Sequence, residues 1–325
     1  KINMAKQPHW TGVFPAVTTQ LKKDQSLDLP ATARHFEALI ESGVSGLIVC
    51  GSLGENQTLD PDEKRAVVRC GIETARGRVP VLSGVAESST RAAVRYVRDV
   101  AALGASGVML MPPMSYKGDP RESMTYLRTV AKEGGLNIMI YNNPLSYAND
   151  ITPALFAELA DEPRFVAIKE SSGDPRRITE VRNAVGNRYA LFTGVDDLLL
   201  EAAILGIDGW VAGTGIAFPA ENQRLWDLTR AGRWDEARAI PDRELMSVPQ
   251  PWVQFIYFNC GKPQFKDARV RKAAAIVSMR SQNWLAFSRS MWTCSSGLRF
   301  DNEVSTSSRL GFFRNSATSR LRVST

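Results

Sequence analysis

Short runs of β-branched and other apolar residues alternate along the chain with longer stretches in which apolar residues recur at helical spacing. Eight of the short runs have the length of a buried strand and end in small or polar residues: 12–18, 46–50, 79–84, 107–111, 137–141, 165–169, 189–193 and 209–212. Amphipathic stretches lie between them, for example 61–75, 89–103 and 152–159. The pattern therefore predicts eight strand–helix units between residues 11 and 231.

This alternation indicates a parallel sheet, because a crossover between parallel strands needs a connection long enough to hold a helix. Eight units favour closure of the sheet into a (β/α)8 TIM barrel. The alternative is an open, doubly wound sheet, which would favour a glycine-rich dinucleotide turn after the first strand, and residues 13–20 hold none. We therefore predict an α/β protein whose residues 1–240 form the barrel and carry the active site.

The last quarter of the chain differs from the rest in charge and pattern. Residues 1–240 hold 27 Lys and Arg against 29 Asp and Glu, whereas residues 241–325 hold 13 against 5. Residues 278–325 contain 12 serines and 7 arginines and follow no helical or strand period. We expect 241–325 to be an atypical, basic, Ser/Arg-rich and poorly ordered extension, since it can bury too little apolar surface to offset its ordering entropy.

Composition and charge exclude several classes of function. The net charge of +6 comes from the C-terminal quarter, so it does not indicate a nucleic-acid groove across the body. Four widely spaced cysteines and two histidines argue against a zinc site and a disulfide framework. No apolar run approaches the length of a membrane span, and residues 1–10 lack the apolar core of a signal peptide. We expect a cytoplasmic protein without membrane or nucleic-acid partners.

Two polar residues end neighbouring strands where a barrel would place its active site. Lys169 ends the run 165–169, and a lysine in apolar surroundings has a lowered pKa and can form a Schiff base with a ketone. The alternative is a lysine that leaves the sheet into solvent. Tyr141 ends the preceding strand, where its hydroxyl could shuttle protons or be merely structural. Their adjacency at the same mouth favours the catalytic interpretation.

Two loops at the same end of the predicted barrel are candidate binding segments. Gly51-Ser52-Leu53-Gly54-Glu55 follows the second strand, and its glycines allow backbone amides to turn inward and bind a carboxylate. An ordinary turn is the alternative. Gly194 and Asp196 follow the seventh strand, where the glycine permits close approach of a substrate. The aspartate would either accept hydrogen bonds from a hydroxylated substrate or cap the next helix.

Four motifs over residues 10–239 resemble those of the dihydrodipicolinate synthase / N-acetylneuraminate lyase family. The segment 51–55 matches its GxxGE loop, Tyr141-Asn142-Asn143-Pro144 its YNxP motif, 168–171 (Ile-Lys-Glu-Ser) its lysine strand, and 194–197 (Gly-Val-Asp-Asp) its GxD segment. The resemblance implies a TIM-barrel Schiff-base lyase, an aldolase, dehydratase or deaminase, that acts on a 2-oxo acid such as pyruvate. It implies a homo-oligomer, dimeric or tetrameric, that needs neither metal nor organic cofactor.

The same resemblance implies roles for particular residues. Lys169 would form the Schiff base, Tyr141 would shuttle protons, and Ser52 would complete the catalytic set. The residues expected to bind substrate are Gly51, Leu53, Ser146, Gly194, Asp196 and Val211.

Three departures from the family pattern concern the subclass. Leu53 stands where dihydrodipicolinate synthases carry a second hydroxyl residue, and Ser146 stands where they carry an arginine for the second substrate's carboxylate. Their tyrosine after the fourth strand, supplied across a dimer interface, has Met114 or Ser115 in its place here, with Tyr116 as a substitute. We therefore favour a hydroxy-pyrroline-carboxylate deaminase or a sugar-acid dehydratase.

Other outcomes stay open at this point. The chain could be a 4-hydroxy-tetrahydrodipicolinate synthase proper, or a truncated fusion product without activity. Residues 248–275 weakly resemble a segment of periplasmic peptide-binding proteins, which is what a gene fusion would produce.

Overall fold

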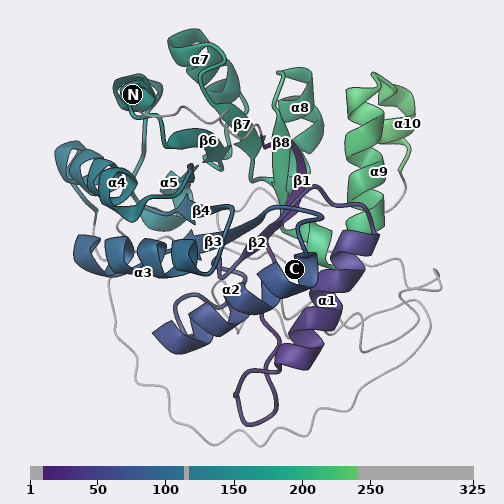
Figure 1. Ribbon diagram of the computed structural model, residues 1–325. Helices are drawn as coiled ribbons and strands as arrows, with labels where there is room; N and C mark the ends of the chain where they lie inside the picture. Colours follow the sequence, from purple (N-terminus) through teal and green to yellow (C-terminus); the bar gives the residue numbers. More distant parts are fainter. Residues whose placement is uncertain (1–9, 113–116, 241–325) are drawn as a thin grey trace, which may run out of the picture. The chain divides into compact units, whose positions relative to one another are not determined.

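A computed structural model of the chain describes residues 10–112 and 117–240, and these form a parallel eight-stranded barrel wrapped by helices (Figure 1). The order of the strands is β1-β8-β7-β6-β5-β4-β3-β2, so sequence neighbours pair around the ring. The strands are β1 (Gly12–Pro15), β2 (Leu47–Val49), β3 (Val81–Val85), β4 (Gly107–Leu110), β5 (Ile138–Asn142), β6 (Phe165–Glu170), β7 (Ala190–Thr193) and β8 (Gly209–Ala212). The predicted TIM barrel is confirmed, and each predicted run contains all or most of one strand.

The ring closes between its first and second strands. A parallel bridge pairs Ala16 with Ile48, and two backbone hydrogen bonds support it. The amide of Val17 donates to the carbonyl of Ile48 at 2.9 Å, and the amide of Ser45 donates to the carbonyl of Val13 at 2.8 Å. This seam is short, but it joins the two edges that an open sheet would leave exposed.

The first six helices, α1 to α6, begin at polar capping residues that the sequence supplies. Helix α2 covers the predicted 61–75, α3 is one residue shorter at each end than 89–103, and Thr152 caps α6 through the amide of Leu155. The α-helices are α1 (Leu29–Glu41), α2 (Pro61–Ala75), α3 (Thr90–Ala102), α4 (Pro120–Gly134), α5 (Pro144–Tyr147), α6 (Pro153–Glu158), α7 (Arg176–Val185), α8 (Leu199–Ile204), α9 (Pro219–Arg230) and α10 (Trp234–Arg238). Short 3₁₀ turns are η1 (Leu159–Asp161), η2 (Asp196–Leu198) and η3 (Thr214–Ile216).

The barrel interior is a packed apolar core. Phe14 and Phe192 meet edge to face with their ring centroids 5.3 Å apart, and both are fully buried. Near the amino end of β4 the ring of Trp10 lies so close to Gly107 that an added Cβ would sit 2.5 Å from it. Since the core is filled with apolar side chains, reactive polar groups are left to the carboxyl ends of the strands.

The register of the strands brings Lys169 and Tyr141, the predicted catalytic residues, together at the carboxyl ends of β6 and β5. Lys169 pairs with Tyr141 of β5 on one side and with Phe192 of β7 on the other. The residues that follow on β6 and its loop, Glu170 and Ser171, are buried and polar. The expectations for 241–325 and for residues 113–116 lie outside the described residues. None of the helices among the described residues is long and apolar enough to cross a membrane.

Candidate active site

Lys169 is a lysine buried at the mouth of the barrel. Only 6% of the residue is exposed, and its Nζ lies 3.8 Å from the centroid of the Tyr141 ring. Burial lowers the pKa of Lys169 to about 8, against smaller opposing effects of Tyr147 and Asp196. The side chain therefore does not leave the sheet into solvent, and a sizeable fraction of its amine is neutral near physiological pH.

Gly194, after β7, leaves the space in which the lysine side chain lies. A Cβ built on Gly194 would stand 2.4 Å from Lys169 Cε and 2.1 Å from Ser171 Oγ. These distances are far below van der Waals contact, so any larger residue would displace the lysine or the serine. The structure thus gives Gly194 a role in making room for Lys169, alongside the substrate contact that the sequence predicts.

The loop after β2 has an unusual backbone that leaves two of its amides without an acceptor among the described residues. Cys50 and Glu55, at its two ends, adopt left-handed conformations with φ of 51° and 67°. The buried side chain of Asn56 braces the turn by donating to the carbonyl of Cys50 at 2.7 Å and to that of Gly84 at 3.2 Å. Within residues 10–112 and 117–240, no group accepts a hydrogen bond from the amides of Ser52 and Leu53. These two amides are therefore available for a carboxylate, and strain of this kind is common at functional sites.

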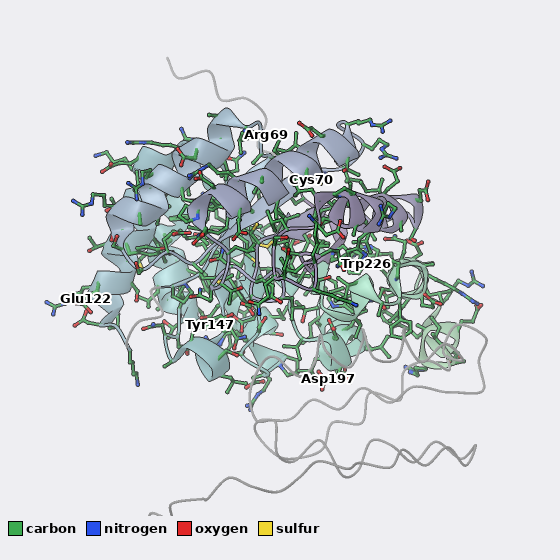
Figure 2. All side chains as sticks on the ribbon, turned by 90° about the horizontal axis from the view of Figure 1, so that it is seen from below. Arg69, Cys70, Glu122, Tyr147, Asp197 and Trp226 are labelled. Atoms are coloured by element: carbon green, nitrogen blue, oxygen red, sulfur yellow. The ribbon has the colours of Figure 1, made fainter. Side chains whose placement is uncertain are left out.

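A tyrosine that the sequence analysis did not single out joins the two catalytic candidates. Tyr147, the last residue of α5, shares a hydrogen bond of 2.5 Å with Ser52 Oγ through its hydroxyl. Its ring packs edge to face against that of Tyr141, with centroids 5.5 Å apart and an interplanar angle of 84°. Figure 2 shows Tyr147 on the same lower side of the barrel as Asp197 of the β7 loop. No periodicity marks Tyr147; its position three residues after the YNNP proline was the available signal.

Tyr141 itself is buried, and its hydroxyl accepts a hydrogen bond of 3.0 Å from Asn143 Nδ2. Burial raises the pKa of Tyr141, so the hydroxyl keeps its proton at neutral pH. Asn143 also accepts the Ser146 amide through its Oδ1 at 3.0 Å and so caps α5. One asparagine side chain therefore orients the Tyr141 hydroxyl and begins the helix that carries Tyr147.

A polar network that runs from the buried Asn142 to the exposed Asp150 holds this helix in place. Asn142 Nδ2 donates to Asp150 at 3.1 Å and to Glu170 at 2.9 Å, while its Oδ1 accepts the Ile151 amide at 2.9 Å. Arg177 closes the network with two bonds to Asp150, at 3.0 and 3.1 Å. The segment after Tyr147 is thus tied to β5, β6 and α7.

Of the remaining predicted site residues, Asp196 and Val211 are held by contacts within the fold, whereas Ser146 lies on the surface. Asp196 accepts hydrogen bonds from Trp210 Nε1 at 2.8 Å and from the amides of Gly213 and Thr214 at 3.1 and 2.7 Å, and burial raises its pKa. The side chain therefore ties the β7 and β8 loops together. Val211 is buried in the interior core with Tyr141, while Ser146 is exposed on α5.

Gly51 and Leu53 belong to the loop after β2. Gly51 is buried and its carbonyl accepts the amides of Gly54 and Asn56, at 3.0 and 3.2 Å. Leu53 packs against the interior core near Gly213.

The described part of the chain contains no group of three or more His, Cys, Asp or Glu side chains that could hold a metal ion. The site thus combines a buried amine of lowered pKa, hydroxyl groups and two amides without acceptors among the described residues.

The model of the Dihydrodipicolinate synthetase family matches residues 9–257, about three quarters of the chain. The chain belongs to this family. The match runs 17 residues beyond Ile240, the end that the sequence pattern indicated for the barrel. The 4-hydroxy-tetrahydrodipicolinate synthase of Sphingopyxis alaskensis is 32% identical over 234 residues, 72% of this chain and 80% of the relative. That of Xanthomonas axonopodis is 34% identical over 70% of this chain and 76% of the relative.

Solved structures of the Dihydrodipicolinate synthetase family share the fold. YagE from Escherichia coli K12, solved in complex with pyruvate, is 26% identical with a TM-score of 0.69 and covers 82% of this chain and 98% of its own. Dihydrodipicolinate synthase from Aquifex aeolicus is 25% identical with a TM-score of 0.70, covering 84% and 100%. As a member of this family, the chain is a lyase.

Proposed function

We propose that the protein is a Schiff-base lyase in which Lys169 attacks the C2 carbonyl of a 2-oxo acid such as pyruvate. The observation that carries this proposal is the buried amine of Lys169, whose pKa is lowered to about 8. At pH 7 roughly a tenth of such amines is neutral, compared with fewer than about one in a thousand for an ordinary lysine. A neutral amine is the form that adds to a carbonyl.

The surrounding groups support this chemistry. The open amides of Ser52 and Leu53 offer two donors to the carboxylate of the 2-oxo acid. The protonated hydroxyl of Tyr141 lies beside the lysine and can give its proton to the carbonyl oxygen. The pyruvate complex of YagE is consistent with a substrate of this class.

The adduct can be trapped directly. Incubation with pyruvate and borohydride is expected to reduce the imine to a stable secondary amine, and peptide mass spectrometry should locate the added mass on Lys169. The Sphingopyxis relative treated in parallel is the positive control. An unmodified Lys169 under conditions that label the relative would overturn the proposal.

The pH dependence of kcat/KM follows from the pKa of Lys169. Because the neutral amine is the nucleophile, kcat/KM for pyruvate-dependent turnover should rise with pH and level off above about pH 8. The raised pKa of Tyr141 keeps its hydroxyl protonated across this range. Initial rates from pH 6 to 10 measure the profile, and a flat profile or a midpoint near 10.5 would contradict a buried, perturbed lysine.

Two finer functions follow from different observations. The names of the relatives favour 4-hydroxy-tetrahydrodipicolinate synthase, which condenses pyruvate with aspartate semialdehyde. Ser146 favours a deaminase of a hydroxy-pyrroline carboxylate or a sugar-acid dehydratase, since a serine cannot form the bidentate pair of an arginine with a second carboxylate. A panel of 2-oxo acids assayed for pyruvate, ammonia and water release distinguishes them.

The residue at position 146 allows a quantitative comparison. We expect condensation with aspartate semialdehyde to be at least about tenfold less efficient than in the Sphingopyxis relative, because a charge-assisted hydrogen bond contributes about 1.5–3 kcal/mol. The change Ser146→Arg should recover part of that difference. An efficiency equal to that of the relative, with no gain in the arginine variant, would favour the synthase function.

A further inference from the structure

Tyr147 contacts two site residues, the buried Tyr141 and the exposed Ser52. It hydrogen-bonds to Ser52 at 2.5 Å, its ring contacts that of Tyr141, and its hydroxyl also interacts with that of Tyr141. We propose that Tyr147 is a catalytic proton-relay residue between Tyr141 and Ser52, and that a single chain supplies the whole relay. This inference rests on the proposed Schiff-base reaction at Lys169.

The two ends of the relay differ in their access to water. Tyr141 is only 6% exposed, whereas the side chain of Ser52 is exposed at the mouth. A proton that leaves or reaches Tyr141 therefore needs an intermediate group to exchange with solvent. A hydroxyl can accept one hydrogen bond while donating another, so Tyr147 can pass a proton without holding a charge.

The protonation state of Tyr147 suits this role. Burial raises the pKa of Tyr147 to about 12, although its hydrogen bond with Ser52 and the charge of Lys169 act in the opposite direction. The phenol is therefore neutral at physiological pH and remains both a donor and an acceptor. A phenolate would accept hydrogen bonds only and would trap the proton it was meant to transfer.

The position of Tyr147 is fixed from both sides along the chain. Its amide donates to the carbonyl of Asn143 at 3.0 Å, within the helix that Asn143 caps. Beyond it, Asn149 Nδ2 donates to the Tyr147 carbonyl at 3.2 Å, and Asn149 in turn accepts the amide of Gly118 at 2.8 Å. The hydroxyl is thus held near Ser52 by groups of the same chain.

Formation of the iminium ion from the neutral amine and the ketone consumes one proton overall. Addition of the Lys169 amine to C2 forms a C–N bond and breaks the carbonyl π bond. The nitrogen releases one proton to the relay, and the carbonyl oxygen takes one from Tyr141, which gives a carbinolamine. The C–O bond then breaks with uptake of one further proton, which enters from solvent through Ser52, Tyr147 and Tyr141. The products are an iminium ion and one water molecule.

Supply of the relay by one chain separates this protein from the family pattern in which a tyrosine crosses a dimer interface. Tyr147 belongs to α5 of the same barrel that carries Lys169 and Ser52. The chemistry at Lys169 would then not depend on a neighbouring subunit. Assembly of the protein can still affect its stability.

The first test removes the Tyr147 hydroxyl. Tyr147→Phe is expected to lower kcat by on the order of 10²-fold, while borohydride still traps the Lys169 adduct after long incubation. Ser52→Ala should have a similar effect, and the double variant should be little worse than either single one, because both interrupt one path. Tyr96→Phe is the matched control: its buried hydroxyl also bonds a serine, Ser83, at 2.8 Å, but belongs to α3 on the outside of the barrel.

The outcomes separate the relay from the underlying reaction. A kcat for Tyr147→Phe within threefold of wild type, or fully multiplicative losses in the double variant, would overturn the relay. Absence of any Lys169 adduct in the wild-type protein would instead overturn the proposed function.

A second test addresses whether one chain is sufficient. Lys169→Ala and Tyr147→Phe chains are unfolded together, refolded as a mixture and assayed. A relay within one chain predicts no recovery, because every barrel lacks either the lysine or the tyrosine. Recovery of about a quarter of wild-type turnover would show that Tyr147 serves a neighbouring barrel and would overturn the single-chain arrangement.

Discussion

Replacement of Lys169 with methionine is expected to abolish turnover and, at the same time, to stabilise the folded protein near neutral pH. Turnover is lost because the imine cannot form without the amine. The gain in stability follows from the cost of keeping a charged amine buried at the mouth. We expect a loss of at least about 10⁴-fold in kcat/KM and a rise of about 1–3 kcal/mol in the free energy of unfolding at pH 7.

The sign of the effect on stability depends on pH. The pKa of Lys169 is about 8 in the folded state and near 10.5 when the chain is unfolded. Between these values the unfolded chain binds more protons, so wild-type stability rises with pH; below about pH 8 the full cost of burial is present. The cation–π contact with Tyr141 offsets part of that cost. The smallest gain in unfolding free energy that we expect for Lys169→Met is therefore about 1 kcal/mol.

Denaturant unfolding of both proteins at pH 7 and pH 10.5 measures the difference. The advantage of Lys169→Met should shrink at the higher pH, where the folded wild-type amine is neutral and the unfolded one is only about half charged. Lys132→Met, at an exposed position of α4, should change stability by less than about 0.5 kcal/mol at either pH. A methionine variant that is less stable at pH 7 would show that the amine is not buried as a charge.

Addition of a single methyl group at Gly194 is expected to inactivate the enzyme while leaving its fold intact. The new Cβ of Gly194→Ala would overlap Lys169 Cε and Ser171 Oγ. Both overlapping atoms belong to side chains that can rotate away, so the displacement should move the reactive amine rather than the backbone. Because misplacement by about 1 Å costs on the order of 10²-fold in rate, we expect a loss of 10²–10³-fold in kcat/KM.

Gly118→Ala provides the matched control for this variant. Gly118 lies just before α4, and a Cβ there meets its nearest neighbours at 3.4–3.6 Å, which is ordinary contact. Steady-state kinetics and thermal unfolding of both variants give the comparison. A kcat/KM of Gly194→Ala near that of wild type would show that Gly194 does not make room for the lysine. Loss of cooperative thermal unfolding would show that Gly194 is needed for the fold and not only for the position of the lysine.

The barrel could be predicted because its signals are local and repeated. Each strand is a short apolar run, and helices such as 61–75 have a proline and an aspartate at their start, as found in α2. Lys169 and Tyr141 could be paired from sequence because both end strands that are neighbours in a barrel, and the register confirms that pairing. The position of single residues at strand ends is therefore predictable from sequence.

The relay and its supports depend on contacts that no local pattern encodes. Ser52 and Tyr147 are 95 residues apart, and a tyrosine after YNNP reads equally well as a surface residue of a short helix. For Asp196 the sequence suggested a role in the site, but the fold gives the side chain hydrogen-bond partners within the protein. Its sequence context favoured a substrate contact or a helix cap, whereas in the fold three donors from β8 and the loop after it surround it. Such roles emerge only when distant loops meet.

The short seam between β1 and β2 has a consequence for how the barrel opens. The two strands are joined by one isolated bridge, Ala16 with Ile48, and not by a continuous paired ladder, so little is lost when they part. In native-state hydrogen exchange the amides of Ser45 and Val17 should therefore lose protection before those at the centre of β6. The Ser52 loop begins immediately beyond β2. If the amides of Ser52 and Leu53 bind the substrate carboxylate as proposed, each such opening would carry them away from Lys169, and a bound 2-oxo acid would hold the seam shut and slow exchange there.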